Sequence, residues 1–275
     1  DALTGFFNDW NDLANHPTDV PTRNTLVSNA ESFTQKLNNV YTKLIDQQQI
    51  YDANVGDLVT DINAIADEIG SLNAKIAFAQ GSGQPAHDLI DQRENRLKDL
   101  SEKIGVNIYY NQSNNSATVE VAGRPLVSFN SVNHLSVQRN AANSNYYDVY
   151  LDQYGAPPVD VTSDIENGEM DALLTMRDTN VPKYLNMLDN FALGLTVAVN
   201  DLHRTGYDLQ TPPTTGNNFF ETTAGPMALA AGSTTTVINF ATPVAGMLNA
   251  GDAITINGET RLIQTLGPGP NTVTL

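Results

Sequence analysis

The chain has 275 residues, contains no cysteine and carries a formal net charge of −17. This acidic balance argues against nucleic acid or an anionic membrane as a partner, because phosphate binding requires a basic surface. The absence of cysteine excludes disulfides, thiol catalysis and cysteine-based zinc sites. No apolar run approaches the ~18 residues of a transmembrane helix, and no signal peptide is recognisable. Because the chain opens on Asp1 rather than Met, we expect a fragment of a longer protein.

A long helix is the strongest prediction, and it follows a short amphipathic segment at residues 6–14. Over residues 21–79, apolar side chains recur at alternating steps of four and three. This spacing averages 3.5 residues and is typical of the narrow seam of a coiled coil. An irregular step near Gln47 and Gln48 resembles a stutter, which unwinds a supercoil locally without ending the helix. We therefore predict one continuous helix of about 55–60 residues, roughly 85 Å long.

Two shorter helices are predicted to cover this seam. One spans residues 87–104 after a turn at 81–85, with Gly105 as its C-terminal cap. The other begins at Pro182 and ends near residues 203–206, in a cationic last turn followed by a glycine. The predicted structural seam consists of Leu26, Phe33, Leu37, Leu44, Leu58, Ile62, Ile65, Ile69, Leu72, Ile76, Leu97, Leu100, Leu188, Leu195 and Leu202.

Between residues 106 and 162 the apolar period shortens to two, which is typical of strands. Residues 106–110 and 117–121 alternate in this way around a polar hairpin loop, and residues 135–137 and 146–154 supply further strands. Near the end of the chain, strands are expected at 237–240, 254–256 and 272–275. Asn257 and Gly258 form the best two-residue hairpin signal in the chain.

Charge density gives the predicted domain boundary, since only four charged residues follow Thr211. Residues 211–216 contain two prolines and a glycine, as a linker does. We expect a helical rod domain over residues 1–210, with a β insertion at about 106–162, and an outer, incomplete β domain over 211–275. The predicted fold class is α+β: an elongated antiparallel helical bundle or coiled-coil rod with a small inserted β element, followed by a Thr/Gly-rich β domain.

Residue types that carry catalysis or bind metals are present, but their spacing matches no recognised site. Histidines occur in four separate segments without a zinc spacing: they are His16, His87, His134 and His203. Acidic residues crowd between 160 and 171, but they do not match a calcium-binding EF-hand loop. Asn167 and Gly168 within that stretch instead indicate a turn that leads into a helix.

Four weaker candidates have ordinary structural interpretations. The glycines at 81–83 lack the residues of a nucleotide-binding loop. Asp88 and Asp91 could orient a substrate, or simply bind an arginine on the same helix. Tyrosines between 146 and 154 could stack on carbohydrate, but alternating tyrosines also suit a strand. Sequons begin at Asn111 and Asn114 and are weak matches. We therefore predict no enzyme, no catalytic or metal-binding residue and no cofactor.

Several short motifs occur in order over residues 1–220. They are DLIDQRE at 88–94, GEMDALLTMRD at 168–178 and NDLHRTGYD at 200–208, with smaller pieces at 23–27, 125–127 and 218–220. In the same order they resemble the DLLDQRD, GxLxxLLxxRD and NxxHxxGYD motifs of the flagellar hook-associated protein 1 family, although Asp171 replaces a usual small residue. Residues 221–275 resemble no part of that family that we can identify.

The resemblance implies a non-enzymatic structural protein at the junction between the hook and filament of the bacterial flagellum. It implies self-assembly into a ring, with the hook protein and a second junction protein as neighbours. It also implies an extracellular location, reached by export without a cleavable signal peptide. The family's terminal helices are not matched, so we expect a core fragment that is monomeric by itself.

Two alternatives remain open from the sequence. One is a surface adhesin or phage-tail-like binding module, in which a coiled stalk presents a β domain to a ligand. The other is an enzyme of polysaccharide turnover, which would depend on a carboxylate such as Asp91.

Overall fold

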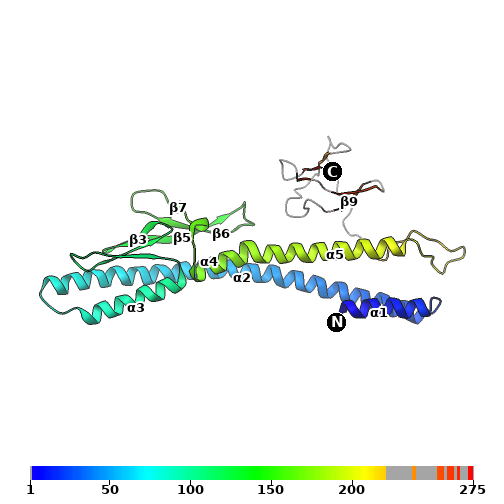
Figure 1. Ribbon diagram of the computed structural model, residues 1–275, viewed down its shortest axis with the longest axis horizontal. Helices are drawn as coiled ribbons and strands as arrows, with labels where there is room; N and C mark the ends of the chain where they lie inside the picture. Colours follow the sequence, from blue (N-terminus) through cyan, green and yellow to red (C-terminus); the bar gives the residue numbers. More distant parts are fainter. Residues whose placement is uncertain are drawn as a thin grey trace. The chain divides into compact units, whose positions relative to one another are not determined.

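The computed structural model describes residues 2–220 and, beyond them, five short strands between residues 237 and 274. The chain divides into two compact units, which we describe separately. Unit 1 contains Asp1–Leu37 and Leu185–Leu275, and unit 2 contains Asn38–Tyr184. Long helices and small antiparallel sheets coexist, so the predicted α+β class is confirmed (Figure 1). The domain boundary expected at residue 211 stays a prediction.

The longest element is α2 (Val20–Gly81), a single helix of 62 residues. It confirms the predicted continuous helix and, at 1.5 Å per residue, measures about 93 Å. It is preceded by α1 (Ala2–Asn15), which is longer than the expected short segment. The Asp19 carboxylate accepts hydrogen bonds from the Thr22 hydroxyl (2.6 Å) and the Thr22 N–H (3.1 Å) at the start of α2. These bonds lower the pKa of Asp19 and cap the first turn.

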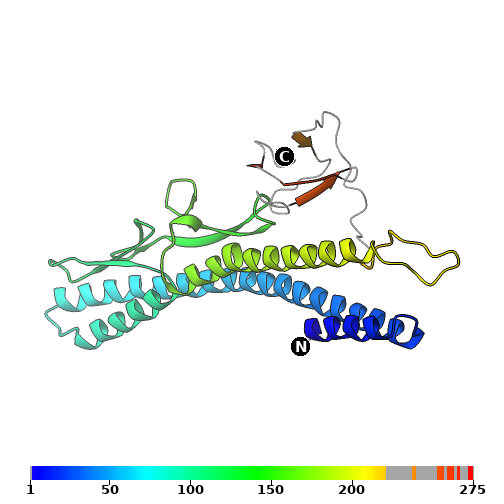
Figure 2. The ribbon, with the colours of Figure 1, turned by 45° about the vertical axis from the view of Figure 1, so that its right-hand side comes forward.

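In unit 2, α2 shares one core with α3 (His87–Lys103) and two antiparallel sheets. Figures 1 and 2 show the strands along one side of α2 and α3 along the other. The first sheet contains, in order, β1 (Asn107–Tyr110), β2 (Ala117–Val121), β3 (Arg124–Ser128) and β4 (Ser131–Val132). The second contains β5 (His134–Asn140), β6 (Tyr146–Asp152) and β7 (Val159–Asp160).

The buried stripe of α2 in unit 2 is wider than a coiled-coil seam. Val59 and Ala66 lie beside the seam residues Leu58 and Ile62, and all four are buried. A helix covered by a neighbouring helix and by sheets needs a broader apolar face than a two-stranded coiled coil does. The 3.5-residue period therefore predicted the helix correctly but underestimated how much of its surface is covered.

Burial varies among the predicted seam positions. The buried ones are Leu26, Phe33, Leu58, Ile62, Ile69, Leu72, Ile76, Leu97 and Leu100. The half-buried ones are Leu37, Leu44, Ile65, Leu188 and Leu195. Leu202, near the end of α5 (Val181–His203), is 75 % exposed. The role of this set as an assembly seam stays a prediction.

Two glycines allow the end of α3 to approach the start of α4 (Gly168–Thr175). A Cβ atom on Gly105 would lie 1.7 Å from the Glu166 carbonyl oxygen, and one on Gly168 would lie 2.7 Å from the main chain of Ile104. The capping residue of α3 is Ile104, in an extended conformation. The prediction that Gly105 is the C-terminal cap was therefore wrong, since it is close packing that requires glycine there.

In unit 2, the sequence missed three strands, β3, β4 and β7, and anticipated the other four. β4 and β7 have two residues each, too few for a period to register, and β3 contains Pro125. Beyond residue 220, β9 (Ala253–Ile256) and β10 (Glu259–Leu262) pair in an antiparallel hairpin. Asn257 and Gly258, which were expected to form its turn, lie outside the described residues.

The remaining strands form a second small sheet in this segment, in which β12 (Thr272–Thr274) lies between β11 (Thr265–Leu266) and β8 (Val237–Asn239). The sequence predicted β8 and β12 but not β11. None of the described helices is both long and apolar enough to cross a membrane.

Aromatic packing builds the core of unit 1. Phe6 from α1 is 1 % exposed and lies with Leu26 and Ala30 of α2. Its ring stacks on Phe33 at 6.0 Å between centroids and contacts Phe220 at 5.7 Å. The amphipathic face recognised at residues 6–14 thus fastens α1 to the first third of α2.

Replacing Ile62 with Ala tests the core of unit 2. Ile62 is fully buried in the cluster that joins α2 to the strands, so Ile62→Ala is expected to lower the free energy of unfolding by about 2–5 kcal/mol. The matched control is Ile50→Ala on the same helix, where the side chain is 51 % exposed and the loss should stay below ~1 kcal/mol. Urea unfolding measures both, and equal losses would contradict the proposed core.

Candidate functional site

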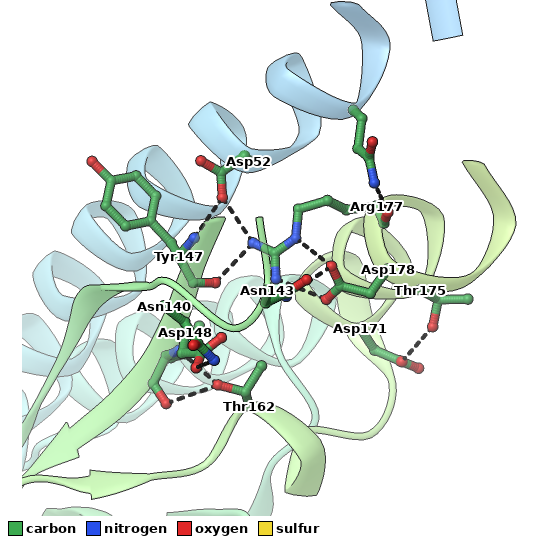
Figure 3. A network of polar contacts seen from close by, with 12 residues as sticks. Asp52, Asn140, Asn143, Tyr147, Asp148, Thr162, Asp171, Thr175, Arg177 and Asp178 are labelled. Carbon is green, nitrogen blue, oxygen red and sulfur yellow. Dashed lines mark hydrogen bonds and ion pairs between the residues drawn. The ribbon is translucent and has the colours of Figure 1, made fainter. Parts of the chain in front are cut away.

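A buried charge network joins three segments of unit 2 at Arg177 (Figure 3). Arg177 is fully buried, and its Nη1 donates to Asp52 of α2 (2.9 Å) and to the Tyr147 carbonyl of β6 (2.8 Å). Its Nε and Nη2 donate to the two carboxylate oxygens of Asp178, each at 2.8 Å. The Tyr147 N–H in turn donates to Asp52 (2.7 Å). One guanidinium therefore holds a helix, a strand and its own backbone segment together.

The segment that carries Arg177 is a π-helical turn, Met176–Asn180, between α4 and α5. In a π-helical turn the backbone hydrogen bonds span five residues instead of four. Such turns are rare and frequently occur at functional sites. The Arg177 carbonyl accepts a hydrogen bond from buried Gln48 of α2 (2.7 Å). Gln48 lies at the irregular step in the apolar repeat, so the stutter marks where α2 exchanges apolar packing for a polar contact.

Burial disfavours the charge on Arg177, whereas Asp178 and Asp52 favour it, and the net result is a raised pKa. Arg139 of β5 adds a second cation to Asp52 at 2.6 Å and lies 3.6 Å from the ring centroid of Tyr147. The Asp52 carboxylate is thus neutralised from two sides. Removing one partner from a buried ion pair is strongly destabilising, because it leaves the other charge buried and unpaired.

A second buried arginine repeats the arrangement on α3. Arg93 is 1 % exposed, donates to the Asn115 carbonyl and to Asn73 (3.3 Å), and pairs with the adjacent Glu94 at 2.9 Å. Asn73, fully buried on α2, bonds both main-chain groups of Ala117 at the start of β2 (2.8 and 2.9 Å). Arg93 and Asn73 therefore bind α3, α2 and the first sheet together.

Glu94 also affects the pKa of Tyr110 on β1. The Tyr110 hydroxyl donates to Glu94 at 2.6 Å, and the Arg93 guanidinium lies 5.3 Å from the Tyr110 ring centroid. Burial, followed by the hydrogen bond and the negative charge of Glu94, raises the pKa of Tyr110 to about 12. Tyr110 therefore remains protonated, and able to donate this hydrogen bond, to a higher pH than an ordinary tyrosine does.

Unit 1 uses one buried asparagine to hold the loop that follows α5. The Asn200 side chain accepts from the N–H groups of Phe219 and Phe220 and donates to the Phe220 carbonyl, all at 2.9 Å. The Asp208 carboxylate accepts from the Thr214 N–H at 2.8 Å and from its hydroxyl. The loop therefore folds back on the helix end and brings two phenylalanines into the aromatic core.

A mainly apolar cavity lies beside this loop. It measures about 770 Å³ and is lined largely by apolar side chains of α1, α2 and α5, including Trp10, Leu26 and Val199. His203 and Asp208 lie at its edge, but each is already bonded to the main chain of the loop. Residues 2–220 and the described strands contain no cluster of His, Asp and Glu able to hold a metal ion.

Several residues that the sequence suggested for catalysis or metal binding instead form structural contacts. Each of the histidines lies in a different local environment, and His134 pairs with Asp67 at 3.0 Å. Asp160 caps Thr162 (2.9 and 2.7 Å), and Asp171 accepts from the Asn167 N–H (3.0 Å), as turn residues do. The acidic stretch is thus a pair of capped turns.

The remaining candidates do not converge either. Asp88 and Asp91 are exposed on α3. Tyr154 is fully exposed beyond the end of β6, away from the partly buried Tyr147. Asn111 and Asn114, the sequon residues, accept main-chain N–H groups two positions ahead (2.8 and 3.1 Å), which shapes the hairpin loop. No carbohydrate platform or paired-carboxylate site forms among these residues.

These contacts define a structural class of protein: a long helix to which a layer of strands is fastened by buried polar side chains. Residues 1–220 match the family described as the flagellar hook-associated protein FlgK helical domain. The chain therefore belongs to this family, and the resemblance inferred from the short motifs is confirmed.

Individual relatives agree with this assignment. Flagellar hook-associated protein 1 of Salmonella typhimurium is 27 % identical over 211 residues, which cover 75 % of this chain and 38 % of the relative. Its namesake in Bacillus subtilis is 24 % identical over 246 residues, covering 82 % and 48 %. The chain thus spans less than half the length of these relatives.

A solved structure shares the fold. The flagellar hook junction protein FlgK from Burkholderia pseudomallei matches with a TM-score of 0.67 and 20 % identity, over 99 % of this chain and 55 % of that one. At this identity the likeness concerns the fold alone.

The motifs that carried the resemblance coincide with the buried polar contacts. DLIDQRE contains Arg93 and Glu94, GEMDALLTMRD ends in Arg177 and Asp178, and NDLHRTGYD begins with Asn200. Reasoning from residue chemistry missed all three contacts, because arginine and asparagine are ordinarily exposed. The repeated pairing of an arginine with an adjacent acid was the signal that could have located two of them.

Removing Arg177 tests the network. Arg177→Met leaves the buried Tyr147 carbonyl and one side of Asp52 without a donor, so the free energy of unfolding should fall by about 3–5 kcal/mol. The control is Arg96→Met on α3, whose ion pairs with Glu68 and Asp99 are exposed and should be worth less than ~1 kcal/mol. Losses of similar size in denaturant titrations would show that Arg177 is no anchor.

Titration of Tyr110 tests the second contact. Glu94→Gln removes the negative charge that helps to hold the Tyr110 proton, so the pKa should fall from about 12 towards its ordinary value of 10.0. Because the folded pKa is raised, this group contributes stability below pH ~10 that disappears as the pH rises through about 12. Tyrosine ring ¹³C shifts follow the titration. Glu102→Gln, at the end of α3, should leave it unchanged; an unchanged pKa in Glu94→Gln would refute the contact.

Proposed function

We propose that this chain is the helical core of a structural protein of the bacterial flagellum that forms the junction between hook and filament. The family assignment over residues 1–220 is the observation that carries this proposal. The relatives named above are hook-associated proteins, and none of those names denotes an enzyme.

The buried contacts support a mechanical role. The 62-residue α2 provides a stiff spacer, and the ties at Arg177 and Arg93 prevent the strands from sliding along it. The buried charges of Arg93, Arg177 and Asp52 are each paired with a neighbour within hydrogen-bond distance. Such an arrangement transmits load and fixes geometry, without any chemical step.

We further propose that the protein acts by lateral packing with copies of itself and with neighbouring axial proteins, namely the hook protein and a second junction protein. The seam positions that are only half-buried in this chain, such as Leu188 and Leu195, would contribute to that packing. We assign an extracellular, flagellar location, export without a cleavable signal peptide, and a monomeric state to this chain alone. The Thr-rich composition after residue 211 and the strands found there support a separate outer β domain.

Immunogold labelling tests the proposal in the bacterium that encodes the chain. Antibodies raised against residues 1–220 should label a narrow band between hook and filament, and deletion of the gene should leave hooks without filaments. Reintroducing the gene should restore both the band and the filaments. Label distributed over the cell envelope, with filaments intact after the deletion, would contradict a junction role and favour the adhesin alternative.

A further inference from the structure

The outer edge of β5 in unit 2 is only partly covered by the contacts described above. β5 pairs with β6 over seven residues, from His134 to Asn140. In the second sheet β6 lies between β5 and β7, so β5 is an edge strand. Edge strands present unpaired N–H and C=O groups that can bond an added strand.

The hydrogen bonds of β6 establish which residues of β5 face outward. The Val149 N–H donates to Thr162 Oγ1 (2.8 Å), and its carbonyl accepts from the Val161 N–H (2.9 Å). The Tyr147 N–H donates to Asp52 (2.7 Å). The main-chain groups of Tyr147 and Val149 therefore point away from β5.

The pairing of β5 with β6 identifies the residues of β5 that lie opposite Tyr147 and Val149. Arg139 lies opposite Tyr147, and Val137 lies opposite Val149. Residues opposite each other in an antiparallel pair either both exchange hydrogen bonds or both do not. The N–H and C=O groups of Val137 and Arg139 are therefore directed to the outer edge.

One position on this edge already has a substitute for a neighbouring strand. Asn63 of α2 donates to the Leu135 carbonyl and accepts from the Leu135 N–H, both at 2.8 Å, as an adjacent strand would. Within the described part of the chain, no hydrogen bond reaches the outward main-chain groups of Val137 or Arg139.

A polar cavity of about 770 Å³ adjoins these two residues and extends to one face of α2 between residues 49 and 57. Gly56 lines it and contributes no side chain. Its two carboxylates differ: Asp52 is neutralised by Arg139 and Arg177, whereas exposed Asp57 forms no ion pair or hydrogen bond in residues 2–220. Because Arg139 and Arg177 already balance Asp52, the unpaired carboxylate of Asp57 is the charge that favours a cation in this cavity.

We propose that the outer edge of β5 docks an extended, basic peptide segment of a partner protein, which adds a strand at Val137 and Arg139. The main chain of the segment exchanges hydrogen bonds with these residues, as in β-strand addition generally. A lysine or arginine of the segment pairs with Asp57. A second copy of this acidic chain is disfavoured as the occupant by charge. The inference goes beyond the proposed junction role and does not depend on it.

Binding of synthetic peptides to the full 275-residue chain tests the proposal. The probe is a fluorescein-labelled octapeptide that alternates valine and lysine, and its Kd is measured by fluorescence anisotropy. We expect saturable binding that slows amide hydrogen exchange at Val137 and Arg139. A peptide of the same sequence N-methylated along one edge, or one with glutamate in place of lysine, should bind at least tenfold more weakly.

Protein variants separate the main-chain contact from side-chain effects. Val137→Pro removes an outward N–H but no bond between β5 and β6, as an edge position tolerates, and should weaken binding about tenfold. Val137→Ala loses the same side chain but retains the N–H, so it should bind normally. Asp57→Asn should weaken binding about threefold, whereas Asp46→Asn, exposed on the same helix outside the cavity, should not.

Three results of the peptide-binding experiments would overturn the proposal. They are absence of binding at millimolar peptide, equal binding by Val137→Pro and Val137→Ala, and equal binding of the N-methylated peptide. The peptide controls need no variant, so they decide the matter even if Val137→Pro fails to fold. Concentration-dependent dimerisation of the chain that Val137→Pro abolishes would also overturn it, by assigning the edge to a second copy.

Discussion

The buried guanidinium of Arg177 is the constraint on which unit 2 depends. It holds the Asp52 carboxylate on α2, the Tyr147 carbonyl on β6 and the Asp178 carboxylate within the π-helical turn. Each of these groups would be costly to bury alone. Since Asp52 and the Tyr147 carbonyl are both satisfied by Arg177 only when the three segments meet, the contact selects one position of the strands along α2.

The rest of unit 2 applies the same principle at regular points along α2. Asn63 fastens β5 and Asn73 fastens β2, each by bonding both main-chain groups of one strand residue. Arg93 of α3 donates a hydrogen bond to Asn73, so α3 contacts α2 at the same point as β2 does. The apolar stripe provides most of the driving force for packing, and these polar contacts provide the register.

The long helix could be predicted from the sequence, because a 62-residue amphipathic repeat is a strong periodic signal. The site could not be predicted in that way. Arg93 and Arg177 look like solvated charges in any hydropathy pattern, and their partners are up to 125 residues distant in the sequence. Gly105 was recognised as a boundary for the wrong reason, since only the packed structure brings the Glu166 carbonyl against it. Short motifs shared with a known family marked these positions, although without their physical meaning.

Native-state hydrogen exchange tests most directly the claim that buried polar contacts make α2 and the strands one cooperative body. Amides of β2, β5 and β6 should open with the same free energy as those of α2 between residues 52 and 76, close to the global value. The same free energy should govern α3 beside Arg93. If the strand amides instead exchange through a low-energy opening while α2 stays protected, the strands unfold independently of the helix. That result would contradict the claim of one cooperative body.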